Sequence, residues 1–337
     1  DVERSRGLGD VYKRQLQKFD GVFSGRTDTP DDREDLETLA AALKPLSTWH
    51  ALDTLQEARE ACGGAGFMFE NRLVGLRADL DIYVTFEGDN NVLLQLVGKR
   101  LLTDYAKQFT GKDAAALAKF AVGMTAGKLF HGAGLRQFGQ SVVDLGQVSR
   151  SVENGLREEQ QHLLLAERVQ QMVADIAGRL RPAGKDKVLG AKLFNENQAE
   201  LIEAARAHGE LLQWEAFTDA VHRVDDADTK KVLTWLRDLF GLQLIEKHLA
   251  WHLINGRLST QRAAAVSRYI DRLCARLRPY ALDLVDAFAY EPEHVRAPIA
   301  SGAERERQDE AREYYAALAA SGDAPVLEKT LKKNAKR

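Results

Sequence analysis

The sequence predicts an all-α protein. Proline is absent between Pro45 and Pro182, and apolar residues in this range recur at intervals of three and four. That spacing places them on one face of a helix, whereas a strand would show an interval of two. Alternating apolar and polar runs are nearly missing throughout. We therefore expect helices in both halves of the chain and less than about one tenth of the residues in strands.

The first helices are set by their start and stop signals. Thr29, followed by the residues Pro-Asp-Asp, combines a hydroxyl cap, a proline at the first helical position and acids near the positive helix end. We expect this helix to run to about Lys44. A second helix from about Leu46 should stop at Gly63 and Gly64, where a left-handed backbone conformation is accessible.

An extended, irregular segment is expected from there to Phe86. Asp89 or Asn90 can cap the next helix, in which apolar side chains surround the axis almost completely and predict burial on most sides. These side chains are Val92, Leu93, Leu94, Leu96 and Val97.

The second half shows further helical periodicity, and we expect a second bundle from about residue 111. The predicted runs are Lys112 to Gly134, Lys230 to Ile254 and Gln261 to Phe288. A surface excursion with Pro292, Pro298 and the charged stretch Glu304 to Glu313 should precede one last helix and a frayed basic tail, Lys332 to Arg337.

Composition limits the classes of protein. The 337 residues are 45% hydrophobic, enough for two domains with real cores, and the formal net charge of −3 does not favour a nucleic acid or an anionic membrane as partner. The two cysteines are far apart in sequence, which fits a reducing compartment. The sequence contains no run of 18 apolar residues that could span a membrane. We expect a soluble intracellular protein with a small molecule or a protein as partner.

Residues 1–15 show no continuity with the rest of the chain and resemble a translated sequencing-adapter scar. We expect the native sequence to begin near Leu16 and to have been cut from something longer. The alternative is a flexible native tail.

The segment from Gln56 to Leu102 carries the most chemistry. It places one carboxylate, Glu87, between bulky Phe86 and flexible Gly88, just before a helix. The glycines at 63, 64 and 66 leave backbone N–H groups open to a phosphate. Taken alone, these features also fit a helix-capping acid and an ordinary helix stop.

The order and spacing of three motifs resemble the acyl-CoA dehydrogenase and oxidase superfamily, in which a glycine-pair loop, an Arg-containing segment and an aromatic-Glu-Gly motif succeed one another before a long helix. The motifs here are Cys62-Gly63-Gly64-Ala65-Gly66, Leu76-Arg77-Ala78-Asp79 and Phe86-Glu87-Gly88-Asp89-Asn90-Asn91. The resemblance is clear over about residues 36–108 and looser to the end of the chain.

The resemblance implies a fold and a site. Residues 16–110 would be the end of the dehydrogenase-type C-terminal helical domain, and residues 111–337 a second, oxidase-type helical domain. Glu87 would be the base that removes the α-proton of a fatty acyl-CoA, and Gly88 would contact that substrate. Gly63 and Gly64 would touch the FAD of a neighbouring subunit, which implies a homodimer or higher oligomer. Two further flavin contacts would be Asp89 and Asn91.

Two features favour the oxidase branch. The interval from Arg77 to Glu87 and the run Glu-Gly-Asp-Asn-Asn look like those of oxidases, and the chain continues for 229 residues beyond Gln108. Leu277 to Ala289 also resembles a late oxidase helix with the sequence Val-Asp-Ala-Phe. An oxidase would be peroxisomal in a eukaryote and cytoplasmic in a bacterium.

Other interpretations stay open. The chain could belong to a dehydrogenase that passes electrons to an electron-transfer flavoprotein, or be a non-enzymatic helical assembly module. His248 and His252 have the spacing of two metal ligands, but interleaved apolar residues favour packing over zinc, and we predict no metal site. Arg77 could bind an anion, although a salt bridge to Asp79, Asp81 or Glu70 is favoured.

Overall fold

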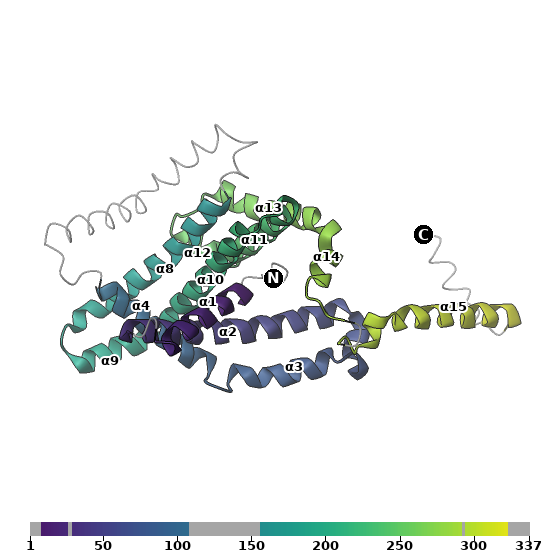
Figure 1. Ribbon diagram of the computed structural model, residues 1–337, viewed down its shortest axis with the longest axis horizontal. Helices are drawn as coiled ribbons and strands as arrows, with labels where there is room; N and C mark the ends of the chain where they lie inside the picture. The colour runs from purple at the N-terminus through teal and green to yellow at the C-terminus, as the bar shows by residue number, and fades with distance from the viewer. Residues whose placement is uncertain (1–7, 26–28, 108–155, 292–293, 323–337) are drawn as a thin grey trace, which may run out of the picture. The chain divides into compact units, whose positions relative to one another are not determined.

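The computed structural model describes residues 8–25, 29–107, 156–291 and 294–322, and the elements within these ranges are helices (Figure 1). No strand occurs among the described residues, which confirms the predicted fold class. The α-helices are α1 (Leu8–Phe23), α2 (Pro30–Ala61), α3 (Leu73–Asp81), α4 (Asn90–Lys107), α8 (Glu158–Leu180), α9 (Lys187–Glu196), α10 (Gln198–His222), α11 (Ala227–Lys247), α12 (Leu249–Ile254), α13 (Thr260–Leu277), α14 (Ala281–Asp286) and α15 (Ala303–Ser321). Short 3₁₀ segments are η2 (Gly63–Phe67), η3 (Phe69–Asn71), η4 (Ile82–Val84), η5 (Arg181–Ala183), η6 (Arg278–Tyr280) and η7 (Pro298–Ser301).

The chain folds as two compact units. Unit 1 comprises the described parts of residues 1–51 and 82–288, and unit 2 those of residues 52–81 and 289–337. α10 is the central helix of unit 1, because it contributes buried side chains to every one of four apolar clusters, formed with α2, α4, α8, α11 and α13. It can do so because apolar or small residues lie on nearly all of its faces.

Close helix crossings surround α10. In α4, an added Cβ at Gly98 would lie 2.5 Å from Cγ of Leu201, and in α10 itself an added Cβ at Gly209 would lie 2.4 Å from Cδ1 of Leu46 in α2. Only glycine lets the helices approach this closely. α2, and α4 with the motif residues Asn90 and Asn91 at its start, thereby pack closely against the centre of unit 1.

The start of α2 agrees with the prediction. The backbone N–H of Asp32 donates to Oγ1 of Thr29 at 3.2 Å, and the backbone N–H of Thr29 donates to the Asp32 carboxylate at 3.2 Å. This reciprocal arrangement satisfies two backbone donors at the helix start.

The predicted break between two helices near Pro45 is wrong, because α2 runs through this proline to Ala61. Proline removes one backbone hydrogen bond, but the surrounding turn is buried against α10: Ala42 and Leu43 are 1% and 2% exposed. Packing holds the turn helical. The continuous helix links the two units in sequence.

Three other expectations are corrected. The segment before Phe86 is not extended but forms η2, η3, α3 and η4. The charged stretch from Glu304 lies inside α15, where ion pairs three residues apart, such as Arg307 to Glu304, support the helix. α4 is not buried on most sides, since Val92 and Leu96 are 59% and 46% exposed.

The long predicted helical runs are divided. A break at His248 separates α11 from α12, and η6 with Pro279 separates α13 from α14. The predicted helix at 112–134 and the tail at 332–337 lie outside the described residues. So does the predicted domain boundary at 110–111, which stays a prediction.

The predicted leader also stays a prediction. α1 begins at Leu8, inside residues 1–15, and packs against α10. None of the described helices has the length and apolar character needed to cross a membrane.

Candidate functional site

The segment that carries Glu87 is a tight turn at the start of α4. Glu87 has a φ of 56° and Gly88 a φ of 105°, so two successive residues adopt positive φ. For a residue with a Cβ this conformation is unfavourable by about 1–2 kcal/mol. Gly88 is required twice over, because its φ is positive and an added Cβ would lie 3.3 Å from the Leu93 side chain.

Asp89 ends the turn and caps α4, as one of the two predicted caps. Its Oδ1 accepts hydrogen bonds from the backbone N–H groups of Asn91 at 2.9 Å and Val92 at 3.3 Å. A carboxylate at this position also interacts favourably with the positive end of the helix. The side chain of Asn91 remains exposed at the same helix end.

Lys44 of α2 ties the turn to the body of unit 1. Its Nζ donates to the carbonyl oxygen of Gly88 at 2.5 Å and to Oδ1 of Asn90 at 2.8 Å. Asn90 is 1% exposed, and its Nδ2 donates to Oγ1 of Thr48 at 2.9 Å. Sequence reasoning missed Lys44, Thr48 and the contacts of Asn90, because these residues come together only across more than 40 positions of the chain.

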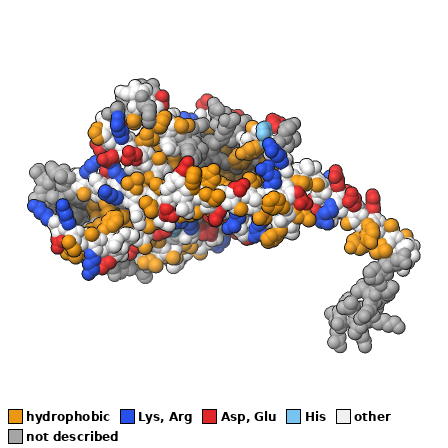
Figure 2. All heavy atoms as spheres, turned by 90° about the horizontal axis from the view of Figure 1, so that it is seen from below, with side chains coloured by type: hydrophobic (Ala, Val, Ile, Leu, Met, Phe, Trp, Pro, Cys, Tyr) orange, Lys and Arg blue, Asp and Glu red, His pale blue; other side chains and the backbone are white. Residues whose placement is uncertain are grey.

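Glu87 itself is exposed. Its neighbours are aromatic: Phe86 is 55% exposed and meets Tyr83 edge to face with ring centroids 6.1 Å apart. The carboxylate thus stands exposed beside aromatic side chains. Figure 2 shows one face of the molecule, on which apolar side chains are interspersed with charged ones.

The glycine loop belongs to unit 2. Gly63 and Gly64 lie on the surface, and nothing lies within 4 Å of a Cβ added at either residue. Gly66 has the opposite role, since an added Cβ would lie 2.1 Å from the backbone oxygen of Arg59. Its hydrogen atom is what lets the loop fold back on the end of α2.

Asn71 holds the glycine loop in place and was not singled out from the sequence. It is 5% exposed, its Nδ2 donates to the carbonyl oxygen of Ala65 at 2.9 Å, and its Oδ1 accepts from the backbone N–H of Ile299 at 2.9 Å. Arg77 forms no ion pair with any of the described carboxylates, so the favoured salt bridge is wrong.

The two histidines in the sequence His-Leu-Ala-Trp-His have separate environments. Nε2 of His248 lies 3.2 Å from Oε2 of Glu210. His252 is fully buried, and neither ring nitrogen has a hydrogen-bond partner among the described residues. Burial, followed by the positive charges of Arg168, His248 and Arg257, lowers the pKa of His252 to about 4. No group of three or more side chains suited to a metal ion occurs in the described ranges.

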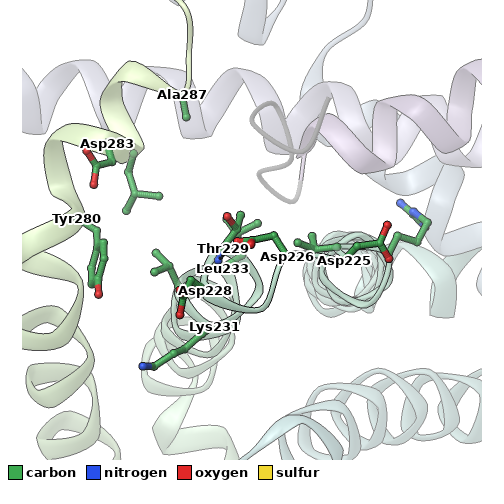
Figure 3. Close-up of a pocket in the computed structure, with 13 residues that line it drawn as sticks. Asp225, Asp226, Asp228, Thr229, Lys231, Leu233, Tyr280, Asp283 and Ala287 are labelled. Atoms are coloured by element: carbon green, nitrogen blue, oxygen red, sulfur yellow. Dashed lines mark hydrogen bonds between the residues drawn. The ribbon is translucent and has the colours of Figure 1, made fainter.

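A cavity of about 620 Å³ lies between the start of α11 and α14. Figure 3 shows Tyr280 and Asp283 on one side of it, with Asp226 and Asp228 opposite. The residues that line it include four aspartates and two cationic residues. This net negative charge disfavours a phosphate-bearing ligand such as a CoA thioester, and Asp226 is already occupied as the cap of α11, accepting from the backbone N–H of Thr229 at 2.8 Å.

The fold and the turn together define an all-α protein with a carboxylate held in left-handed conformation at a helix start. Comparisons with known proteins give the family. Residues 5–102 match the family model described as the C-alpha1 domain of acyl-CoA oxidase, and residues 158–302 match the one described as acyl-CoA oxidase. The chain belongs to the acyl-CoA oxidase family and contains its C-terminal helical region.

Individual relatives agree. The chain is 32% identical over 283 residues to a putative peroxisomal acyl-coenzyme A oxidase 3.2 of Arabidopsis thaliana, covering 81% of this chain and 38% of the relative. It is 28% identical over 277 residues to an acyl-coenzyme A oxidase-like protein of Mus musculus, covering 82% and 42%. The chain thus spans about two fifths of the length of these curated relatives.

Solved structures share the fold. Acyl-CoA oxidase 3 of Yarrowia lipolytica matches with a TM-score of 0.69 and 22% identity, over 87% of this chain and 41% of the other. Acyl-CoA oxidase-1 of Caenorhabditis elegans, in a complex with FAD and ATP, matches with a TM-score of 0.68 and 17% identity, over 88% and 42%.

Proposed function

We propose that the chain is the C-terminal part of an FAD-dependent acyl-CoA oxidase that converts a fatty acyl-CoA into the trans-2-enoyl-CoA, with Glu87 as the catalytic base. The observation that carries this proposal is the conformation of Glu87, a non-glycine residue held at positive φ at the start of α4 in a chain of this family. Strained backbone of this kind is concentrated at functional sites.

In the proposed reaction, a carboxylate oxygen of Glu87 takes the α-proton of the thioester. The electrons of that C–H bond form the new double bond, and the β-hydrogen leaves with its electron pair, for which bound FAD supplies the acceptor. A positioned base of this type contributes about 10² to 10⁴ in rate. The exposed carboxylate next to Phe86 would have to be covered by substrate and by other parts of the protein, which would exclude water from the proton transfer.

The flavin contacts proposed from the family motif fit the described residues. The open backbone at Gly63 and Gly64 leaves room for close approach by a flat ligand. Asn91 has an exposed side chain, whereas one oxygen of Asp89 already serves the helix cap, so that a flavin contact would use the rest of this carboxylate. Gly88 would meet the substrate through its backbone.

A homodimer is part of the proposal. Phe67, Met68 and Phe69 come shortly after the glycine pair and are 70%, 48% and 78% exposed. Such large apolar side chains, side by side on one loop, favour a covering protein surface, and a second subunit would also bring its FAD to Gly63 and Gly64. The relatives named as peroxisomal suggest the same compartment for a eukaryotic source, and the cytoplasm for a bacterial one.

The test uses the full-length protein that carries this chain. Anaerobic mixing with acyl-CoA should bleach the flavin absorbance, and Glu87→Gln should slow this bleaching by at least about 10² while leaving flavin content and thermal stability unchanged. Bleaching within about tenfold of the unmodified rate would show that another group takes the proton.

The electron acceptor is tested separately. Hydrogen peroxide formed in stoichiometric amounts with the enoyl product indicates an oxidase. Dependence on an electron-transfer flavoprotein, without peroxide, would indicate a dehydrogenase instead. Absence of flavin from the purified full-length protein would favour the assembly module.

A further inference from the structure

The backbone around Glu87 is held from one side by a single lysine. Lys44 projects from α2, is half-buried, and hydrogen-bonds to both residues that flank Asp89, namely the Gly88 carbonyl at 2.5 Å and the Asn90 side chain at 2.8 Å. The two bonds fix the peptide between Gly88 and Asp89 and the first residue of α4. A flexible turn is thereby attached to a rigid helix at two points.

The attachment is reinforced one turn further along α2. Oγ1 of Thr48 accepts from Nδ2 of Asn90 at 2.9 Å and donates to the carbonyl oxygen of Lys44 at 3.0 Å. Lys44, Thr48 and Asn90 therefore form a closed set of hydrogen bonds, and the amide of Asn90, almost fully buried, is satisfied on both its oxygen and its nitrogen. A closed polar network of this type specifies one geometry.

The turn needs such support. Left-handed backbone is disfavoured for a residue with a Cβ, such as Glu87, so contacts around the turn must hold it in this form. The hydrogen bond from a charged ammonium to the Gly88 carbonyl is of the stronger kind.

We propose that Lys44 is a positioning residue for the reaction: it holds the Glu87–Gly88 turn in its left-handed form. The proposal rests on the function proposed for Glu87. It assigns a role to a residue 43 positions upstream of that glutamate, on a different helix.

The first test needs neither flavin nor substrate. Amide hydrogen exchange is measured by mass spectrometry on the present chain, for peptides that contain residues 87–93. Lys44→Met should speed their exchange at least about tenfold, because a lost hydrogen bond to a charged group corresponds to about that factor or more. Lys192→Met is the matched control and should leave the exchange unchanged. Lys192 is exposed on α9, and its ion pair within the described ranges is with Glu196 at 3.8 Å.

The second test follows turnover in the full-length protein. Lys44→Met should lower kcat at least about tenfold and change KM less, because a loosened turn misplaces the base. Thr48→Val loosens the same network from its other end and should lower kcat in the same direction. Lys44→Arg keeps a charged donor and should recover much of the kcat that Lys44→Met loses. If Lys44→Met fails to fold, Thr48→Val should still speed exchange and lower kcat, and unchanged values of both would overturn the positioning role.

The outcomes are distinguishable from those for Glu87. Lys44→Met with the same exchange and the same kcat as Lys192→Met overturns the positioning role, even where Glu87→Gln abolishes turnover. Conversely, full activity of Glu87→Gln overturns the catalytic assignment, while faster exchange in Lys44→Met would still support the tether.

Discussion

Gly241 of α11 lies directly against the indole of Trp214 in α10. A Cβ added at Gly241 would lie 2.5 Å from Nε1 of this tryptophan and 2.0 Å from Oε1 of Gln161, which accepts the indole hydrogen bond at 3.0 Å. Trp214 is 2% exposed and Gln161 fully buried. The crossing of these two helices and the polar pair in their core therefore depend on the missing methyl group.

Gly241→Ala should destabilise unit 1 by about 1–3 kcal/mol, because the new methyl group overpacks the core and displaces a buried hydrogen bond. Thermal unfolding measured by circular dichroism would test this. Gly178→Ala in α8 is the control, since nothing lies within 4 Å of its added Cβ. Alanine there should stabilise the helix by up to about 1 kcal/mol, and equal melting temperatures for the two variants would contradict the packing argument.

Helix starts and the glycine stop were predictable because they depend on neighbours in sequence. Thr29 and Asp32 cap each other, and Asp89 caps α4, through contacts within three residues. The passage of α2 through Pro45 was not predictable, because burial of the preceding turn against α10 decides it. The exposure of Val92 was likewise not predictable from the sequence, since the periodicity of apolar residues does not show which of them other helices cover.

The candidate site rests on its motif rather than on its geometry. Glu87, Gly63 and Gly64 are proposed from the order of short motifs along the chain. The tether could not be found in that way, because no local signal distinguishes Lys44 from any other lysine on an amphipathic helix. Its partners are set by the packing of α2 and α4 against α10.

The glycine loop provides a prediction that separates folding from flavin binding. Gly66→Ala should disrupt the loop, because its Cβ would collide with a backbone oxygen, that of Arg59, which cannot move aside as a side chain can. Gly64→Ala should leave the loop intact, since its added Cβ meets nothing within 4 Å. Limited proteolysis of the present chain compares the two: faster cleavage near residues 62–71 is expected for Gly66→Ala alone. Any loss of FAD in full-length Gly64→Ala would then come from the ligand contact.

Glu210 gives a third prediction, on the buried charges of unit 1. Its side chain is 3% exposed and accepts from Arg168 and Lys247 at 3.1 Å and from His248 at 3.2 Å. Burial alone would raise its pKa, but these partners outweigh burial and lower the pKa to about 2.

Glu210→Gln should therefore lower the free energy of unfolding by about 3–5 kcal/mol, because it leaves the buried Arg168 guanidinium without the carboxylate that lies close to it. Lys247→Met should cost less than about 1 kcal/mol, since the Lys247 side chain is 53% exposed and its interaction is screened by water. Urea unfolding of both variants measures the difference. A loss of stability for Lys247→Met as large as that for Glu210→Gln would contradict this, because it would show that the exposed Lys247 contributes as much as the buried Arg168–Glu210 pair.

The last prediction concerns acid sensitivity. His252 is buried with both ring nitrogens unpartnered among the described residues, and its folded-state pKa of about 4 lies below its ordinary value of 6.5. Between these two values the unfolded chain binds a proton that the folded chain does not, so stability is complete above pH 6.5 and is lost as the pH falls toward 4. The full difference between the two pKa values of His252 corresponds to a loss of about 3 kcal/mol in the free energy of unfolding. Glu210 contributes little to this pH dependence, because the stability that it provides is lost only below its ordinary pKa of 4.5, as the pH falls toward 2.

His252→Leu should flatten the stability profile between pH 6.5 and 4, measured by urea unfolding at intervals of pH, whereas the same substitution at the exposed His50 should leave the slope as it is. An unchanged slope in His252→Leu would mean that water reaches the imidazole and that the charged form is accommodated in the folded chain.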